Sequence, residues 1–293
     1  MQWISADLLI DLWRIMLRVD ARPSFRGAPR IGLWESPTGL QFFHPPRAGD
    51  AAFYRALYGR LGRRRFPSAK RPRGEFALAA AHVRDGDRVL DVGCGFGAFR
   101  HAIPRADYTG LDPHVEGEPH AGWFRGETLE RHLESHEGAY DVVCGFQVLE
   151  HVEDPLGMLK QMSRAVRPGG RVIVAVPHVP SAHTRIPNYL IGCIPHHLTW
   201  WTSDALDVAA RKAGLVNPAV QRVPWTAVDG LVYWMARLSP IKCQDRHYRH
   251  AWSWHLASAV SFLAGYVAWT VRPTPPQGAD EGASLMLVAE KPA

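Results

Sequence analysis

The stretch VLDVGCGFGAF, residues 89–99, combines three alternating glycines with one carboxylate. The glycines are Gly93, Gly95 and Gly97, and the carboxylate is Asp91, two positions before the first glycine. Glycine adopts left-handed backbone conformations at little cost and lets the chain approach a ligand closely. The pattern therefore predicts a ligand-binding turn, and its chemistry depends on which ligand the turn holds.

A phosphate is a poor fit for this turn. A P-loop ends in Gly-Lys-Ser/Thr, which the stretch lacks. A dinucleotide pattern is satisfied by Gly93, Gly95 and Ala98, so an NAD-dependent oxidoreductase stays open as an alternative. Asp91 would repel a pyrophosphate, whereas it can anchor an ammonium group, and Asp112 ends the next predicted strand, where it can take both ribose hydroxyls. A ligand with an amino-acid end, a ribose and no phosphate fits better, and S-adenosylmethionine is such a ligand.

Histidines that follow strand ends are the candidates for proton transfer, because imidazole titrates near neutral pH. We select His151, His178 and His197 as candidate catalytic residues, with His196 beside the last of them. Two structural alternatives stay open. His151 can belong to a helix start beneath the cofactor, and the two neighbouring histidines can simply pack their loop together with the tryptophans at 200 and 201.

Short apolar runs and amphipathic helical segments alternate from residue 75 onward, and they must position these residues. Strands are predicted at 88–92, 107–112, 140–146 and 171–177, and helices at 76–83, from 98, at 126–134 and at 154–166. Such alternation predicts a parallel sheet with helices on both faces. Ligands then bind at the carboxyl ends of the strands, where the glycine turn lies.

Four motifs, in order and spacing, resemble those of class I S-adenosylmethionine-dependent methyltransferases, in particular the ubiquinone-pathway O-methyltransferase-like group. They are VLDVGCGFGAF, YTGLDPH, YDVVCGFQVLEHVEDP and LKQMSRAVRPGGRVIVAVP. The resemblance covers roughly residues 76–215 and returns at 283–291. It implies a Rossmann-like, doubly wound α/β fold with a seven-stranded sheet, mostly parallel, whose last strand is antiparallel.

The resemblance also implies which residues hold the cofactor. The glycine turn would surround its methionine end, the carboxylate at 112 its ribose, the pair at 127–128 its adenine, and the pair at 146–147 its sulfonium. The implied set is Asp91, Gly93, Cys94, Gly95, Gly97, Asp112, Pro113, Glu127, Thr128, Phe146 and Gln147.

A metal site is not expected. Some similar ubiquinone-pathway enzymes hold a divalent cation with Glu-x-x-Glu-His, but this chain has Gln147 in place of the first glutamate, and an amide is a poor ligand for a hard cation. Relatives with a similar leader sometimes carry a zinc ribbon there, whereas the first cysteine of this chain is Cys94. We therefore assign no metal ligands.

Composition limits the partners and the location. Lys and Arg number 34 against 28 Asp and Glu, a net charge of +6, which suits acidic partners or anionic membrane surfaces. Seven basic residues lie between Arg60 and Arg73, but they lack the interleaved aromatic residues of a nucleic-acid site, so no nucleic acid is expected. The four cysteines are widely spaced and suggest a reducing cytoplasm. The N-terminus shows no secretory signal.

Residues 225–272 form an apolar insert that carries five tryptophans. Its longest apolar run is about the length of a membrane span, but interspersed polar residues make spanning improbable. A lid over the pocket, a dimer surface and an interfacial hairpin at a membrane would share this composition, so peripheral membrane contact and a homodimer both stay open.

These observations predict four parts: a helical and irregular leader at 1–74, the S-adenosylmethionine-binding core at 75–224, the apolar helical insert at 225–272 and the final core strand at 273–293. In the leader, helices are expected at 4–19 and 52–61. The expected activity is methyl transfer to oxygen, with carbon or nitrogen next, on a small, apolar or lipid-like acceptor. A non-catalytic S-adenosylmethionine-binding module is the second alternative.

Overall fold

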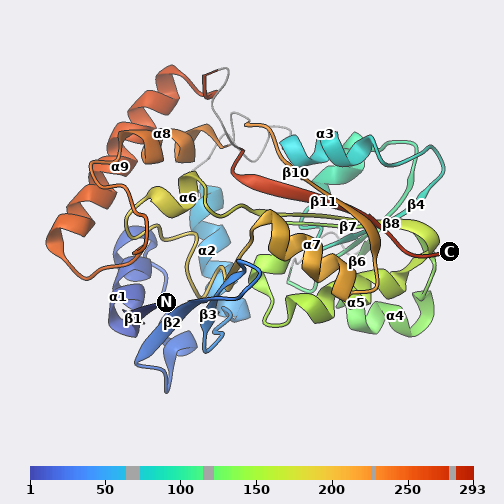
Figure 1. Cartoon of the computed structure of the whole chain (residues 1–293), viewed down its shortest axis with the longest axis horizontal. Helices are drawn as coiled ribbons and strands as arrows, with labels where there is room; N and C mark the ends of the chain where they lie inside the picture. The colour runs from blue at the N-terminus through green and yellow to red at the C-terminus, as the bar shows by residue number, and fades with distance from the viewer. Residues whose placement is uncertain (64–72, 115–121, 226–228, 277–281) are drawn as a thin grey trace. The chain divides into compact units, whose positions relative to one another are not determined.

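The computed structural model describes the chain except for residues 64–72, 115–121, 226–228 and 277–281 (Figure 1). Most of the basic stretch at 60–73 lies outside the described residues. The chain forms two compact units, which we describe separately. The first comprises Met1–Arg71, His178–Thr202 and Pro224–Ala283, and the second comprises Pro72–Pro177, Ser203–Val223 and Ser284–Ala293.

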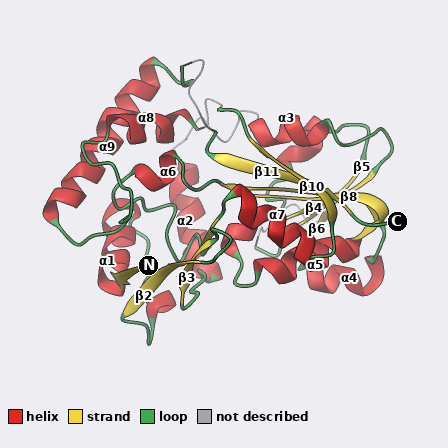
Figure 2. Cartoon of the chain, viewed as in Figure 1, coloured by secondary structure: helices red, strands yellow, loops and turns green. Residues whose placement is uncertain are grey.

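The second unit is built on a seven-stranded sheet (Figure 2). Its strands are β4 (Arg88–Val92), β5 (Asp107–Leu111), β6 (Phe124–Arg125), β7 (Tyr140–Phe146), β8 (Val166–Pro177), β10 (Val216–Arg222) and β11 (Ser284–Glu290). They lie in the order β10-β11-β8-β7-β4-β5-β6. The neighbours from β8 to β6 are parallel, whereas β11 is antiparallel to both β8 and β10. The predicted sheet, with its antiparallel last strand, is confirmed.

Helices cover both faces of this sheet. They are α3 (Gly74–Ala80), the 3-10 helices η4 (Ala98–Ala102) and η5 (Leu149–His151), α4 (Leu129–His136), α5 (Pro155–Ala165) and α7 (Ser203–Lys212). Helices α4, α5 and α7 contact one another in succession on one face, and α3 contacts η4 on the other (Figure 1). The central strands β4, β7 and β8 are buried on both faces, as near-continuous apolar runs should be.

Local sequence sets the starts of two of these helices. The Thr128 side chain accepts a hydrogen bond from the Arg131 backbone N–H, 3.3 Å away, and thereby caps α4. The Asp154 side chain accepts one from the Gly157 backbone N–H, 2.8 Å away, and Pro155 occupies the first turn of α5. Both are the side-chain types that satisfy free amides at a helix N-terminus.

The first unit contains a sheet that the sequence analysis did not anticipate. Its strands are β1 (Gln2–Ser5), β2 (Arg30–Glu35), β3 (Gln41–His44) and β9 (Thr199–Trp200), in the order β1-β2-β3-β9. The helix expected at 4–19 starts only after β1, as α1 (Ala6–Leu12) and the π-helix η1 (Trp13–Leu17). Pairing of β1 with β2 draws the first residues into the sheet, because tertiary contacts override a helical pattern at its end.

The other helices of the first unit are the 3-10 helix η2 (Arg22–Phe25), α2 (Ala51–Arg63), which includes the helix expected at 52–61, α6 (Ala182–Arg185), α8 (Gly230–Leu238) and α9 (Trp252–Val271). The last two confirm the helical character of the insert. None of the helices in the described part of the chain combines the length and hydropathy that a membrane span requires.

Candidate functional site

The glycine turn connects β4 to η4 at the carboxyl end of the core strands. Gly93, Gly95 and Gly97 have φ angles of +70°, +53° and +66°, in the left-handed region that favours glycine. A Cβ on Gly93 would lie 2.5 Å from a Val148 methyl, and one on Gly97 would lie 2.6 Å from the Trp123 ring. A Cβ on Gly95 would meet no atom within 4 Å. The outer glycines therefore permit close packing, and the middle one faces open space.

The Asp112 carboxylate is attached to this turn. Its Oδ2 accepts a hydrogen bond from the Gly95 backbone N–H, 3.0 Å away, and its Oδ1 accepts one from the His114 backbone N–H, 2.9 Å away. The structure thus brings together two residues that the sequence predicted to serve one ligand. A carboxylate has about four lone-pair sites, so two amide bonds leave capacity for further donors such as ribose hydroxyls.

Asp91 lies at the base of the turn with 2% of its surface exposed. Its Oδ2 accepts a hydrogen bond from the Tyr108 hydroxyl, 2.7 Å away, whereas Oδ1 is buried with no hydrogen-bond partner among the described residues. Burial raises the pKa of Asp91 to about 7, against the opposing effects of the Tyr108 hydroxyl and the Cys144 thiol. A buried acceptor without a donor is costly, and a ligand ammonium group would satisfy it.

Tyr108 is a residue that the sequence analysis missed. It is the second residue of β5, and the motif DYTGLD has the pattern of an ordinary strand. The structure brings it to Asp91 through strand register, since Tyr108 pairs with Val89 on the neighbouring strand β4, two residues before Asp91.

The other predicted cofactor residues have identifiable roles within the core. Glu127 Oε1 lies 2.8 Å from the His132 ring, whose other nitrogen lies 2.6 Å from the Tyr140 hydroxyl. Thr128 caps α4, as described above. Phe146 packs between the rings of two other phenylalanines, Phe76 and Phe99. These contacts orient the side chains and do not identify what they bind.

Gln147 follows β7 with a φ of +59°, a left-handed conformation. Its Nε2 donates to the Ser284 hydroxyl on β11, 3.2 Å away. Cys94 is partly buried in the turn, and Pro113 is exposed after β5. Asp91 lies near the end of β4, and six more predicted residues follow β4 or β5: Gly93, Cys94, Gly95, Gly97, Asp112 and Pro113. All seven lie at the carboxyl edge of one sheet.

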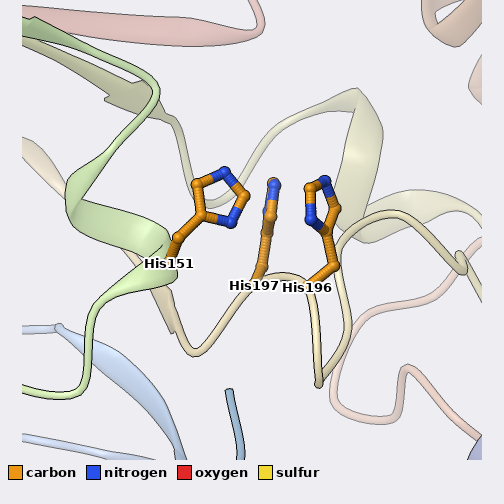
Figure 3. A group of neighbouring side chains, drawn as sticks. All are labelled: His151, His196 and His197. Atoms are coloured by element: carbon orange, nitrogen blue, oxygen red, sulfur yellow. The ribbon is translucent and has the colours of Figure 1, made fainter. Parts of the chain in front are cut away.

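His151 ends η5 of the core, directly after a buried glutamate (Figure 3). Glu150 has no measurable exposure, and its carboxylate oxygens have no hydrogen-bond partner among the described residues. His151 Nε2 lies 3.8 Å from Glu150 Oε1, which is beyond hydrogen-bond distance. Burial raises the pKa of Glu150 to about 8, although Arg73 acts to lower it. Glu150 is therefore a neutral acid at pH 7.

His178 and His197, the other candidate bases, belong to the first unit. His178 is buried, and its backbone N–H donates to the Ala283 carbonyl, 2.9 Å away. His197 and its neighbour His196 stand side by side on one loop (Figure 3), with ring centroids 4.7 Å apart. The His196 ring also packs edge-on against Trp13, at 6.3 Å between centroids. This packing agrees with the structural alternative for the pair and leaves its catalytic role as a prediction.

A family model described as a methyltransferase domain matches residues 54–220, more than half of the 293 residues. The match includes the glycine turn, Asp112 and the turn that carries His151.

Two curated relatives share part of the chain. The ubiquinone biosynthesis O-methyltransferase of Sodalis glossinidius is 41% identical over 99 residues, which are 30% of this chain and 40% of that protein. The protein of the same name from Vibrio cholerae serotype O1 is 38% identical over 131 residues, which are 41% of this chain and 51% of that protein. The chain therefore spans about half, or less, of the length of these relatives.

A solved structure gives a longer match. A chain from the complex between the Haloferax volcanii Trm112 methyltransferase activator and the putative methyltransferase superposes with a TM-score of 0.52. It is 19% identical, and the match covers 81% of this chain and 97% of that one. At this identity the likeness supports the fold alone.

Proposed function

The chain belongs to the methyltransferase-domain family matched over residues 54–220, and we propose that it transfers the methyl group of S-adenosylmethionine to an oxygen of a small, apolar acceptor. The class I methyltransferase identity expected from the four motifs is confirmed at the level of family and fold. The acceptor and the methylated atom are the proposed part. The observation that carries the proposal is the pairing of the open Gly95 turn with Asp112, together with a buried Asp91 Oδ1 that has no hydrogen-bond partner in the described part of the chain.

The described residues fit S-adenosylmethionine. Asp112 has acceptor capacity left for ribose hydroxyls, and its anchoring by the Gly95 amide holds it at the turn. Asp91 Oδ1 would accept from the ligand ammonium group. Gly95 leaves room above the turn for the methionine portion.

The cofactor supplies an activated methyl group on a sulfonium, so the chain has little covalent chemistry to perform. Its residues must hold the acceptor in line with the methyl carbon and exclude water. A hydroxyl acceptor must also lose its proton, and a histidine is suited to accept it near neutral pH. We assign this task to His151, His178 or His197. His151 is the first to test, because it lies in the core unit that carries the glycine turn.

Two observations favour an apolar acceptor methylated on oxygen. The relatives from Sodalis and Vibrio are both described as O-methyltransferases of ubiquinone biosynthesis. The chain also carries an apolar helical insert with exposed aromatic residues, and such surfaces suit apolar substrates better than charged ones.

Incubation with S-adenosylmethionine labelled in its methyl group tests the proposal. The acceptor panel should contain phenols and catechols with alkyl tails of increasing length, beside matched amines. Label should pass to a phenolic oxygen, with a Michaelis constant that falls as the tail lengthens. Transfer only to the amines would refute the oxygen assignment. Binding of S-adenosylhomocysteine without transfer to any acceptor would indicate a non-catalytic module.

The candidate bases are separated by single variants, His151→Gln, His178→Gln and His197→Gln, assayed with one phenolic acceptor. Loss of the base should lower kcat by about 10²–10⁴-fold and remove the rise of kcat with pH, while the affinity for S-adenosylhomocysteine is kept. A variant that only raises the Michaelis constant of the acceptor identifies a histidine that lines the substrate pocket.

A further inference from the structure

The outward face of α9 is more apolar than its packed face. Its exposed side chains include Trp252, Leu256, Leu263, Val267 and Val271, with 77%, 52%, 64%, 63% and 82% of their surface exposed. No Asp, Glu, Lys or Arg occurs between residues 252 and 271. Large apolar residues scattered singly on a surface are normal, but a continuous exposed stripe of them marks an interaction site.

The packed face of α9 carries two tryptophans, Trp254 and Trp269, together with a row of small residues. Ala257, Ser261 and Gly265 recur at four-residue spacing and are all buried. A Cβ on Gly265 would lie 2.7 Å from the Met235 backbone nitrogen, so α8 approaches α9 closely at this point. Small residues at this spacing let two helices pack tightly. The pair of helices is thus held together without using the large aliphatic side chains of α9.

Helix α8 extends the apolar surface. An open groove of about 630 Å³ lies between the two helices. Both helices belong to the first unit, and they lie beside each other in Figure 1. It is lined by Trp234, Leu238, Leu263, Ala264, Val267, Ala268, Val271 and Arg272. Arg272 is the only charged residue in that lining, and it stands at the C-terminal end of α9. The exposed apolar face therefore spans α9 and one side of α8.

Basic residues adjoin the two helices along the chain. Between Gly230 and Arg272 there are five of them, against the single acidic residue Asp245; the basic ones are Arg237, Lys242, Arg246, Arg249 and Arg272. All five are exposed. The first lies in the last turn of α8, the next three lie between α8 and α9, and the last follows α9, so none interrupts the apolar stripe. Apolar burial with flanking positive charge is the combination that binds an amphipathic helix to an anionic bilayer surface.

We propose that the α8–α9 pair docks on an anionic lipid surface, with α9 lying in the plane of the interface. The exposed stripe would enter the boundary between headgroups and acyl chains, and the flanking arginines and lysine would contact lipid phosphates. Trp252, at one end of the stripe, is of a residue type that favours this boundary. The described helices do not meet the requirements for a membrane span, so the pair lies on the membrane.

The size and charge of the face favour lipid over a second copy of the chain. The 20 residues of α9 present a stripe about 30 Å long, and the 9 residues of α8 add one about 14 Å long, each about 10 Å wide. A stable protein interface buries about 800 Å² on each partner, which is more than the two stripes together supply. Two copies meeting at this face would also bring their basic flanks together.

Co-sedimentation with vesicles tests the proposal. The whole protein should bind vesicles of phosphatidylcholine with about one third phosphatidylglycerol, and bind pure phosphatidylcholine vesicles at least about tenfold more weakly. Raising the salt concentration from about 0.05 M to about 0.5 M should weaken binding to the anionic vesicles. Absence of binding to anionic vesicles at low salt, or equal binding to both compositions, would overturn the proposal.

Matched variants connect the binding to the face. Leu263→Ser with Val267→Ser should reduce vesicle binding about tenfold or more. Ile15→Ser removes an aliphatic side chain that is 72% exposed elsewhere in the same unit, and it should leave binding unchanged. Equal losses in both, or in neither, would refute the role of the stripe.

Charge variants test the basic flanks. Arg246→Gln with Arg249→Gln should reduce binding at low salt and make it less dependent on salt than the binding of the wild type, whereas Arg30→Gln serves as the control. The Arg249 backbone, not its side chain, bonds to Asn188, so the variant keeps that contact. Sedimentation velocity completes the set: a dimer of the wild type that Leu263→Ser with Val267→Ser converts to monomer would assign the face to a second copy and overturn the lipid assignment.

Discussion

Two buried carboxyl groups in the core, Asp91 and Glu150, have fewer partners than their oxygens can accept. Burial raises the pKa of both groups into the neutral range. A raised pKa in the folded state means that the unfolded chain releases the proton first as pH rises. Stability contributed by the neutral group is then lost between the ordinary pKa and the raised one.

Replacing Glu150 with Gln tests this linkage. The wild type should lose stability relative to Glu150→Gln as pH rises from about 4.5 to about 8, because only the wild type must keep a proton that the unfolded chain gives up. The free energies of unfolding, from urea titrations across this range, should diverge by at least about 2 kcal/mol, since each unit of pKa shift is worth about 1.4 kcal/mol. A difference that stays constant with pH would contradict the buried, neutral state of Glu150.

Asp91 predicts a pH dependence of ligand binding. Below pH 7 its carboxyl is protonated and cannot pair with the ammonium group of S-adenosylhomocysteine. The affinity should therefore rise from about pH 5 to about pH 7 and then level off, by up to about tenfold per pH unit. Titration calorimetry at several pH values checks this, and Asp91→Asn should bind weakly with little pH dependence. Wild-type affinity that is flat across the range would remove Asp91 from the ammonium site.

Single residues differ in how far the sequence could predict them. The role of Asp112 was predictable because a carboxylate at the end of the strand that follows a glycine turn is placed to bind ribose hydroxyls. The bond from Tyr108 to Asp91 was not, because a tyrosine within an apolar strand has the same pattern as a core residue. Its hydroxyl finds Asp91 only through the parallel register of β4 and β5.

At the scale of elements, a comparison of two glycines distinguishes the cost of a left-handed backbone from an effect on ligand binding. Gly95 has a φ of +53° and Gly138, in the turn before β7, has a φ of +63°; a Cβ at either would meet no atom within 4 Å. Gly95→Ala and Gly138→Ala should each cost about 1–2 kcal/mol of stability, because both force a left-handed alanine.

Only Gly95→Ala should also weaken binding of S-adenosylhomocysteine, by about tenfold or more, because its new methyl group projects into the space that the ligand needs. Thermal unfolding and calorimetry measured on both variants give the comparison. Equal affinities for the two variants would show that the space beside Gly95 is not the ligand site.

The contact between α8 and α9 gives a second prediction at this scale. Gly265→Ala places a methyl group against the Met235 backbone, and overpacking of this kind costs about 1–3 kcal/mol. Gly59→Ala is the matched control: Gly59 lies on α2 with no atom near its would-be Cβ, so the change should stabilise the unit by about 0.5–1 kcal/mol. Opposite signs in denaturant unfolding are expected, and a stabilising Gly265→Ala would refute the close approach.

Elements with strong local patterns were predicted well. The strand expected at 140–146 is β7, and the helix expected at 154–166 is α5 with one residue fewer at each end. The sheet of the first unit was missed although β2 and β3 pair locally, at Glu35 and Gln41, because its outer strands β1 and β9 are short and pair with distant residues. Strand β9 supplies only Thr199 and Trp200, which pair with Phe42 and Gln41, and two residues leave no periodicity to detect.

At the scale of the whole molecule, the chain is interleaved. His178–Thr202 and Pro224–Ala283 belong to the unit that begins at Met1, whereas β11 returns to the core. The sequence predicts a continuous core at 75–224 with its final strand at 273–293, because composition changes along the chain and does not reveal that 178–202 pack with distant segments. The core strands, whose motifs are local, were assigned to the correct sheet.

The central claim is that this chain binds S-adenosylmethionine through Asp112, and titration of the whole protein with S-adenosylhomocysteine by calorimetry tests it most directly. The wild type should bind this ligand and show no heat with NADH. Asp112→Ala should lose about 1.5–3 kcal/mol of binding free energy, the range for hydrogen bonds to a charged group. Asp107→Ala, at the exposed opposite end of β5, should bind as the wild type does. Unchanged affinity in Asp112→Ala, or tighter binding of NADH than of S-adenosylhomocysteine, would contradict the account.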